Sequence, residues 1–353
     1  MNKRQVLIVP AAGLSSRFPN MRPKWLLTHP NGKLMIENIL EPFLQSKYEI
    51  ILTTTEKIYN DYDVEIIIKQ IFGNRVHVDT IPYQTLSSCE TISYTLNNYL
   101  NNEDCEIIIK DSDSLVTPTV SSLSGNFCVG IDVSKIRDTD IRNKSFIKYD
   151  NNHIITDIVE KKIFSNTISV GLYGFESSLS FLKNYLEILK ISDGMELYVS
   201  HIIYNLIIND SYFKYIESSE FKDWGTLSSW NIENKNHNSI FCDYDGVLVK
   251  NKGQYGKENW ENSEDIPIIS NIMSIKSKLD LGSVLIITTC RPKKYENKIR
   301  ELLSRFGISV FQIIFDLPHS KRILINDYAP TNPYPTSISI NVERNQNLEN
   351  FLL

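Results

Sequence analysis

The chain of 353 residues is long enough for two domains with separate hydrophobic cores. Hydrophobic residues make up 42% of it and charged residues 22%, which is typical of a soluble globular protein. The net charge of −5 argues against a nucleic-acid-binding surface. Its apolar runs are too short to span a membrane, and the first residues do not form the apolar core of a signal peptide. Five dispersed cysteines without a CxxC pair indicate reduced thiols. We therefore expect a cytoplasmic protein whose partners include neither nucleic acid nor membrane.

The first two-thirds of the chain alternates apolar runs typical of buried strands with segments of helical periodicity. The expected strands are Val6–Val9, Ile50–Thr54, Val76–Ile81, Glu106–Lys110, Phe127–Asp132, Ser145–Val159 and Ser169–Phe175. The expected helices are Met35–Ser46, Asp63–Phe72, Cys89–Leu100 and Met195–Ile208. This order predicts an α/β domain with a doubly wound parallel sheet, whose ligands bind beyond the carboxyl ends of the strands.

A polar run over residues 233–238 interrupts this pattern and predicts a linker between a first domain of residues 1–232 and a second of residues 239–353. The second domain repeats the α/β pattern. Its expected strands are Ser239–Tyr244, Val284–Thr288, Val310–Ile314 and Ile323–Ile325, with a helix over Tyr295–Phe306. We expect a second doubly wound domain.

The stretch from Val6 to Leu27 carries the first chemical signal. Its strand breaks into a turn of small residues in which Gly13 can supply a positive φ, and exposed N–H groups of such a turn can hold phosphate. Arg17 adds a planar fork for phosphate oxygens, and Lys24 adds a point charge. The alternative is an ordinary surface loop with two solvated cations. The carboxylates later in the chain favour the phosphate site.

This stretch resembles the signature loop of the sugar-phosphate nucleotidyltransferases, or pyrophosphorylases, which usually reads G-x-G-(T/S)-R followed by P-K. The single glycine here is closer to the A-A-G-x-x-(S/T)-R variant of cytidylyl- and related transferases. The resemblance implies a Rossmann-like domain in which Arg17 and Lys24 are catalytic. It also implies nucleotide contacts at Ala11, Ala12 and Gly13.

Two acidic segments suit a Mg²⁺ site, because nucleotidyl transfer needs charge neutralisation more than covalent chemistry. Asp111 and Asp113 follow an expected strand, and Asp223 opens a D-W-G-T segment. Without the resemblance, an acidic turn and a helix N-cap would explain them. The resemblance implies that Asp113 and Asp223 chelate the metal, with Asp111 as an alternative to Asp113.

Further segments resemble the same family in the same order. The segment from Tyr83 to Thr91 resembles the one that contacts the base, with Gln84 as base reader and Ser88 where many relatives have glycine. Glu160-Lys161 resembles the V-E-K segment that holds the sugar phosphate and its hydroxyls, and Gly171 lies in the segment that resembles the wall of the sugar pocket. Glu196 is a further hydroxyl acceptor or a solvated surface residue.

The second domain begins with F-C-D-Y-D-G-V-L, which resembles the first motif of haloacid dehalogenase-like (HAD) hydrolases. An Asp at a strand end can attack phosphorus, and a second acid two residues on can protonate the leaving oxygen, which are the roles of Asp243 and Asp245. The resemblance implies a phosphoryl-binding hydroxyl at Thr289, a stabilising cation at Lys321, and Mg²⁺ ligands at Asp243, Asp245 and Asp327. Only about 40 residues separate the first two motifs. We therefore expect little or no cap domain.

Together these signals predict a bifunctional enzyme. The first domain would join an NTP, with CTP favoured, to a phosphorylated sugar or polyol with Mg²⁺ as cofactor, and the second would hydrolyse a phosphomonoester. Such a pair of steps fits synthesis of activated sugars or polyols for surface polysaccharide. Two alternatives remain: one domain binds ligand without turnover, or the second is a phosphotransferase or mutase. The sequence leaves open whether the chain forms a homo-oligomer.

Overall fold

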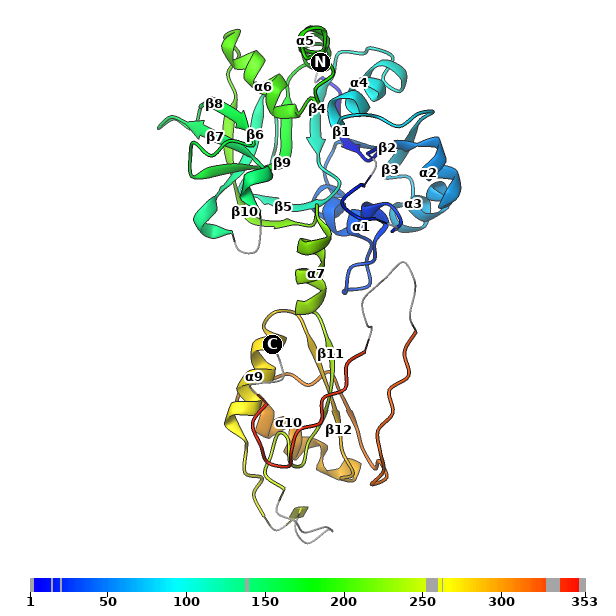
Figure 1. The fold of residues 1–353 in the computed structure, drawn as a ribbon, viewed down its shortest axis with the longest axis vertical. Helices are drawn as coiled ribbons and strands as arrows, with labels where there is room; N and C mark the ends of the chain where they lie inside the picture. The colour runs from blue at the N-terminus through cyan, green and yellow to red at the C-terminus, as the bar shows by residue number, and fades with distance from the viewer. Residues whose placement is uncertain are drawn as a thin grey trace. The chain divides into compact units, whose positions relative to one another are not determined.

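The computed structural model describes residues 3–13, 15–19, 21–136, 140–251, 260–261, 263–327 and 337–348. The chain divides into two compact units, Met1–Trp230 and Asn231–Leu353, drawn in Figure 1. Each unit has its own sheet and its own hydrophobic core. The units are described separately below.

Ten strands among the described residues form the sheet of the first unit, in the order β3-β2-β1-β4-β9-β6-β10-β5, with β7 and β8 attached through β9. The strands are β1 (Gln5–Pro10), β2 (Glu49–Thr55), β3 (Val76–Ile81), β4 (Glu106–Lys110), β5 (Ser114–Pro118), β6 (Phe127–Asp132), β7 (Ser145–Tyr149), β8 (Ile155–Glu160), β9 (Thr167–Phe175) and β10 (Lys214–Asp223). The helices are α1 (Met35–Leu40), α2 (Glu56–Asp61), α3 (Val64–Phe72), α4 (Ser88–Asn98), α5 (Ser178–Ile191), α6 (Val199–Ile208) and α7 (Leu227–Asn236), with short 3₁₀ turns that include η1 (Lys24–Leu26).

Helices cover both faces of this sheet, as the alternation along β1 shows. Val6 and Ile8 belong to the cluster that contains side chains of α4, α5 and α6. Leu7 and Val9 belong to the cluster that contains side chains of α1 and α3. All four are fully buried, and burying each contributes roughly 1.5–3 kcal/mol. A continuous apolar run is therefore the correct signature for this two-sided strand.

The expectation of a parallel sheet was wrong in part. Strands β3, β2, β1 and β4 are parallel, but β9 runs antiparallel to both β4 and β6, and β5 runs antiparallel to β10. The expected single strand Ser145–Val159 is a hairpin of β7 and β8, because a polar turn that begins at Asp150 separates its halves. A connection this short can join only antiparallel strands.

Near the end of the first unit, the sequence prediction of one helix over Met195–Ile208 also needs correction. Helix α6 begins at Val199, and residues 195–198 precede it as irregular chain. Helix α5, with Ser177 capping its first turn, was not predicted. Its exposed Leu179, Leu186 and Leu189 obscure the period of its buried face.

The second unit has a three-stranded parallel sheet in the order β11-β12-β13 among its described residues. Its elements are β11 (Ser239–Asp243), α9 (Ile269–Leu279), β12 (Val284–Thr288), η5 (Lys293–Tyr295), α10 (Glu296–Ser304) and β13 (Gln312–Ile314). The expected strand Ile323–Ile325 is not one: these residues are irregular, and their side chains are 78%, 56% and 90% exposed. Their apolar character suggested a buried strand, but the core of this unit does not include them.

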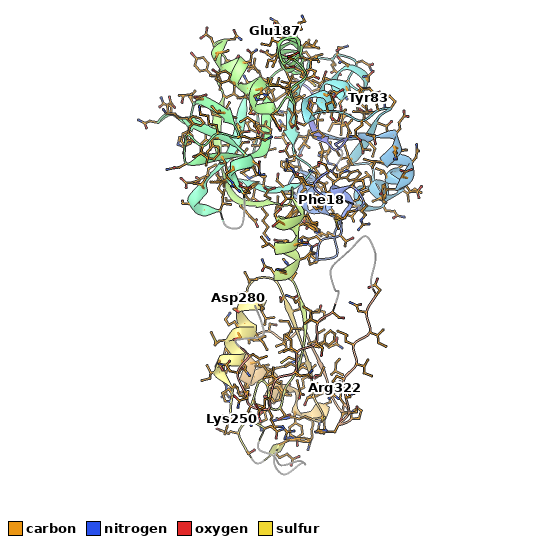
Figure 2. The ribbon with its side chains drawn as sticks, in the orientation of Figure 1. Phe18, Tyr83, Glu187, Lys250, Asp280 and Arg322 are labelled. Carbon is orange, nitrogen blue, oxygen red and sulfur yellow. The ribbon has the colours of Figure 1, made fainter. Side chains whose placement is uncertain are left out.

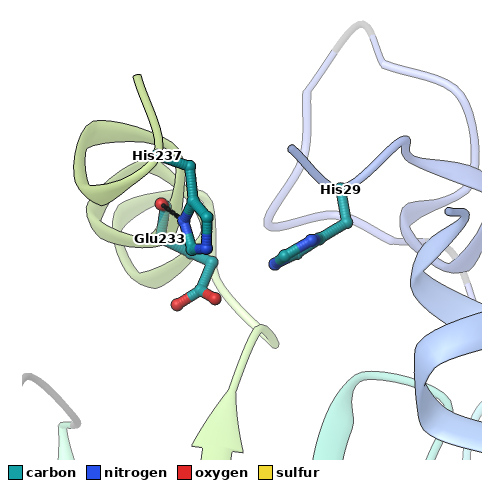
Figure 3. A group of neighbouring side chains, drawn as sticks. All are labelled: His29, Glu233 and His237. Atoms are coloured by element: carbon teal, nitrogen blue, oxygen red, sulfur yellow. Dashed lines mark hydrogen bonds between the residues drawn. The ribbon is translucent and has the colours of Figure 1, made fainter. Parts of the chain in front are cut away.

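The predicted linker over residues 233–238 is not a loop along its whole length. Helix α7 continues through Asn236, so the first four residues of the predicted linker are helical. The boundary between the two units falls inside this helix. His237 follows the last turn, and its Nδ1 lies 2.9 Å from the carbonyl oxygen of Glu233 (Figure 3). A ring N–H donated there is a hydrogen bond to a carbonyl in the last turn of α7.

Two further sequence expectations concern the chain as a whole. All five cysteines lie in the described part of the chain and are free thiols. Within that part, the structure has no helix whose length and apolar character would let it cross a membrane.

Candidate functional site

A cavity of about 580 Å³ opens in the first unit at the carboxyl ends of β1 and β4. An α/β sheet is expected to bind ligands at this edge. Most of the residues predicted for the first domain line this cavity: Ala11, Gly13, Arg17, Lys24, Gln84, Ser88, Asp111, Asp113, Glu160, Lys161, Gly171, Glu196 and Asp223. Ala12 is fully buried beside it. The fold therefore brings together segments that are up to about 200 residues apart in the sequence.

The turn after β1 is held from behind by neighbouring strands and loops. Ala11 N–H donates to the Thr53 carbonyl at 2.8 Å, which extends the β1–β2 pairing into the turn. Gln84 Nε2 donates to the carbonyl of Ala12, so the predicted base reader also fixes the turn. The positive φ expected at Gly13 is instead at Ser15, with φ of 49°. A Cβ on Gly13 would meet no atom within 4 Å, so this glycine leaves open space beside the cavity.

Asp113 and Asp223 converge at Gly225. A Cβ on Gly225 would lie 2.9 Å from Asp113 Oδ2 and 3.0 Å from Asp223 Oδ1, so a larger residue would enter the space between the carboxylates. The strand pairing explains this arrangement: β5 follows Asp113 directly, and Asp223 at the end of β10 pairs with Ser114 at the start of β5. Trp224 N–H also donates to the Asp113 carbonyl at 2.8 Å. Closely spaced carboxylate oxygens are the donors that Mg²⁺ prefers.

Asp111 points elsewhere. Its N–H donates to the Gly171 carbonyl at 2.8 Å, and a Cβ on Gly171 would lie only 2.3 Å from Asp111 Oδ2. Gly171 also has a φ of +80°, so both its backbone and its lack of a side chain are needed here. The two alternatives for the strand-terminal ligand are thus separated: Asp113 approaches Asp223, whereas Asp111 packs on the strand that carries Gly171.

The pKa values of Asp111 and Asp113 shift in opposite directions, because the two side chains have different neighbours. Burial and the charge of Asp113 raise the pKa of Asp111 to about 6. Burial also acts to raise the pKa of Asp113, but the charges of Lys24 and Lys144 outweigh it and hold that pKa below its usual range. Lys24 Nζ lies 2.5 Å from Asp113 Oδ2, and Lys144 Nζ lies 2.7 Å from Asp223 Oδ2. Asp113 is therefore the better anionic ligand for a cation.

The side of the cavity formed by β8 and α6 holds the predicted acceptor residues. Glu160 Oε2 accepts hydrogen bonds from the hydroxyls of Ser145 and Ser200, the latter at 2.7 Å. The hydroxyl of Tyr198 donates to Glu196 and accepts from Lys161 Nζ, which also lies 4.3 Å from the centre of the tyrosine ring. This wall combines a cation with oriented carboxylates, a combination that can bind a phosphorylated polyhydroxyl compound.

Three of the predicted residues of the second unit, Asp243, Asp245 and Thr289, lie at the end of β11 or on the loops that follow β11 and β12. Asp243 ends β11 and pairs in register with Thr288 of β12. The hydroxyl oxygen of Thr289 accepts the N–H of Arg291 at 3.1 Å, which fixes the turn after β12. Burial and the charge of Asp245 raise the pKa of Asp243.

Both carboxylate oxygens of Asp245 are bound by Arg291, at 2.7 and 2.9 Å. The same guanidinium bonds Asp265 at 2.9 and 3.0 Å, and Tyr244 donates its hydroxyl to Asp265 at 3.1 Å. The Arg291 side chain is only 3% exposed. The predicted acid Asp245 is thus part of a buried ion network, and its carboxylate can bind a metal or serve a substrate only after that network rearranges.

The remaining two predicted residues of this unit, Lys321 and Asp327, are exposed and lie in irregular chain. Arg322 and His319 lie near Asp243 and act to lower its pKa. Arg322 (Figure 2) reaches back to the turn after β12, where its guanidinium lies 4.0 Å from Cys290 Sγ. Arg322 is therefore an alternative to Lys321 as the cation near Asp243.

No family model and no curated protein matches the sequence. Among solved structures, a nucleoside-diphosphate-sugar pyrophosphorylase from Vibrio cholerae RC9 has a TM-score of 0.56 and 20% identity, over 65% of this chain and 99% of its own. The inositol-1-phosphate CTP transferase from T. maritima has a TM-score of 0.52 and 13% identity, over 66% of this chain and 96% of its own. The CTP:phosphocholine cytidylyltransferase from Streptococcus pneumoniae has a TM-score of 0.51 and 17% identity, over 65% of this chain and 98% of its own. About two-thirds of this chain therefore has the nucleotidyltransferase fold.

Two lysines that shape the unit with the nucleotidyltransferase fold, Lys110 and Lys144, were not predicted from the sequence. Lys110 is completely buried, and its ammonium donates to the carbonyls of Asp111 and Ser114 at 2.8 and 2.7 Å and to the Ser114 hydroxyl at 2.9 Å. Burial lowers its pKa to about 8, against the opposing charges of Asp111 and Asp113. A lysine that ends the apolar run Ile107–Ile109 was the available signal, since a charge beside a buried strand needs specific partners. Lys144 offered no comparable signal.

Proposed function

We propose that the first unit transfers a nucleotidyl group from an NTP to a phosphorylated sugar or polyol and releases pyrophosphate. The observation that carries this proposal is the meeting of Asp113 and Asp223 at Gly225, inside a cavity that also contains several cations. The fold shared with solved pyrophosphorylases and CTP transferases supports the same class of reaction. A binding protein without turnover would have less need for two acids held so close together.

In this reaction, an oxygen of the acceptor phosphate attacks the α-phosphorus of the NTP, and pyrophosphate leaves. Arg17 and Lys24 bind oxygens of the triphosphate, where their positive charge offsets the charge on the leaving group. Lys161 holds the acceptor phosphate, while Glu160 and Glu196 accept hydrogen bonds from hydroxyl groups of the sugar or polyol. Binding both substrates in one cavity lowers the entropic barrier to their encounter.

Mg²⁺ held by Asp113 and Asp223 would neutralise phosphate charge and align the reacting oxygens. The donor set suits this ion, because both ligands are carboxylates whose oxygens converge on one point at Gly225. Asp111 does not belong to this pair in our proposal. Its contact with Gly171 suits a role in shaping the pocket.

CTP is the favoured nucleotide, followed by UTP and dTTP. The loop sequence is of the kind common among cytidylyltransferases, and two of the similar structures are described as CTP transferases. The amide of Gln84 can pair with any pyrimidine edge, so it does not choose among these bases. The acceptor is proposed to be a polyhydroxyl phosphate, because the wall around Lys161 presents carboxylates and hydroxyl groups.

For the second unit we propose a phosphatase that works through an aspartyl-phosphate on Asp243. The phosphorus of the substrate would bond to the Asp243 carboxylate, the alcohol would leave with a proton, and water would then release phosphate. Thr289 and the cation Arg322 are proposed to hold the phosphoryl oxygens, and Asp327 to contribute to a Mg²⁺ site with Asp243. The two units would then serve one pathway to an activated sugar or polyol for surface polysaccharide.

One observation favours a second candidate for this unit, namely ligand binding without turnover. Both oxygens of Asp245 are occupied by Arg291, and this ion pair opposes the acid–base role that hydrolysis assigns to Asp245. A phosphotransferase or mutase would show turnover with a sugar acceptor instead of water.

The test is to incubate the full chain with Mg²⁺, each of four NTPs, and a panel of sugar and polyol phosphates. Pyrophosphate release with a pyrimidine NTP supports the transferase, and release with purines alone contradicts the nucleotide assignment. In the same panel without NTP, free phosphate supports the phosphatase. Phosphate moved between sugars supports the phosphotransferase, and no turnover supports the binding role.

A further inference from the structure

Two lysines from different elements form ion pairs with the two carboxylates of the proposed metal site. Lys24, in η1, bonds Asp113 Oδ2 at 2.5 Å, and Lys144, just before β7, bonds Asp223 Oδ2 at 2.7 Å. All four side chains are less than a quarter exposed, and all four residues line the cavity. The sequence singled out Lys24 for the triphosphate, whereas Lys144 has no assigned role.

Each oxygen of the acid that Lys144 contacts already accepts one hydrogen bond. Asp223 Oδ1 accepts the N–H of Gly225 at 3.0 Å, and Oδ2 accepts Lys144. A divalent cation and an ammonium group use the same carboxylate lone pairs, and their like charges repel at this range. A metal that binds Asp223 therefore does so more tightly once the Lys144 ammonium has moved to another anion.

The surroundings of Lys144 allow such a movement. Its backbone is fixed on both sides, because its N–H donates to the Ile141 carbonyl at 3.1 Å and its carbonyl accepts the N–H of Lys161 at 3.1 Å. The ammonium stands at the end of a flexible four-carbon chain, 5.6 Å from the centre of the Phe221 ring. The bond to Lys161 also makes Lys144 a backbone neighbour of the residue assigned to the acceptor phosphate, and both line the cavity.

We propose that Lys144 is a phosphate-positioning residue that exchanges Asp223 for a substrate phosphate when nucleotide and metal bind. This inference rests on the transferase proposed above. Lys144 restrains the binding of metal alone at Asp223, and the phosphates of the nucleotide remove that restraint by accepting the ammonium. Metal and nucleotide then bind cooperatively, and the released ammonium lies where the acceptor phosphate meets the α-phosphate.

The test measures Mn²⁺ binding to the full chain by electron paramagnetic resonance, alone and with an α,β-methylene analogue of each NTP. In Lys144→Met, Mn²⁺ alone should bind about tenfold more tightly than in wild type, because the competing charge is gone. The same variant should bind the analogue about tenfold more weakly and lose most of the cooperativity between the two. Lys144→Arg keeps the charge and should retain the wild-type cooperativity.

The controls separate this inference from the proposed function. Lys148→Met removes an exposed lysine of β7 and should change neither affinity. Asp223→Asn should abolish tight Mn²⁺ binding with the analogue; if wild type itself shows no such binding with any analogue, the transferase proposal fails. If wild type and Asp223→Asn behave as expected but Lys144→Met binds Mn²⁺ alone no more tightly than wild type, the role of Lys144 is refuted. A merely structural lysine would weaken both affinities on removal.

Discussion

Replacing Arg291 by methionine tests whether the network of the second unit stabilises it as the geometry indicates. Burial acts to lower the pKa of Arg291, but the hydrogen bonds that it donates to Asp245 and Asp265 outweigh burial and raise that pKa, so the guanidinium is charged throughout the folded state. Methionine keeps much of the side-chain volume and leaves the carboxylates of Asp245 and Asp265, which are 25% and 7% exposed, without their cation. Breaking a buried pair in this way costs about 3–5 kcal/mol of unfolding free energy.

For a unit of this size, each kcal/mol lowers the melting temperature by about 3–6 °C, so the unit should melt roughly 10–25 °C lower. Calorimetry of the full chain gives the shift, and hydrogen exchange in β11, β12 and α10 assigns the transition to this unit. Arg305→Met is the matched control, because its ion pair with Glu301 is 70% exposed on both sides and contributes about 0.5 kcal/mol or less.

A compensated variant distinguishes the ion network from simple packing. Arg291→Met combined with Asp245→Asn and Asp265→Asn removes the charges that the single variant leaves buried, so it should recover at least half of the lost stability. A single variant that melts within about 3 °C of wild type would refute the network as a source of stability. A triple variant no more stable than the single one would attribute the loss to packing.

The remaining predictions concern catalysis. Gly225→Ala should lower pyrophosphate release by about a hundredfold, because its Cβ would separate the two carboxylates, and a rate within threefold of wild type would contradict the convergence. Chelation of Mg²⁺ by EDTA should stop pyrophosphate release, and added Mg²⁺ should restore it. Asp243→Asn should abolish phosphate release while pyrophosphate release persists, and equal phosphate release by wild type and variant would exclude the covalent mechanism.

Strands with strong local signals could be predicted well from the sequence. The bounds of β3, β4, β6 and β12 agree with those expected, because each stretch is rich in apolar or β-branched residues and is followed by polar or turn residues. Strands β5 and β10 were not predicted, since they are short or polar and are stabilised by pairing with each other. The same pairing brings Asp113 close to Asp223. Each acid could be proposed from its own motif, but their approach to each other depends on a strand register formed across about 100 residues.

In the second unit the limits were similar. Asp243 lies in the predicted strand Ser239–Tyr244 and Thr289 follows the predicted strand Val284–Thr288, and the structure places both at the carboxyl ends of neighbouring strands. The ion pair of Arg291 with Asp265 joins residues that lie far apart in the sequence without a regular spacing, so no local sequence pattern predicts this ion pair. The choice between Lys321 and Arg322 depends on which way irregular chain turns, and hydrophobic periodicity carries no information there.

Pyrophosphate release measured in parallel for wild type, Asp223→Asn and Lys148→Met tests the central claim most directly. With Mg²⁺, CTP and the panel of sugar and polyol phosphates, wild type and Lys148→Met should release pyrophosphate at matching rates with at least one acceptor. Asp223→Asn should lose most of that activity while remaining folded by circular dichroism, because it lacks one of the two carboxylate charges at the metal site. Near-normal release by Asp223→Asn, or no release by wild type with any NTP and acceptor, would contradict the assignment of this cavity to nucleotidyl transfer.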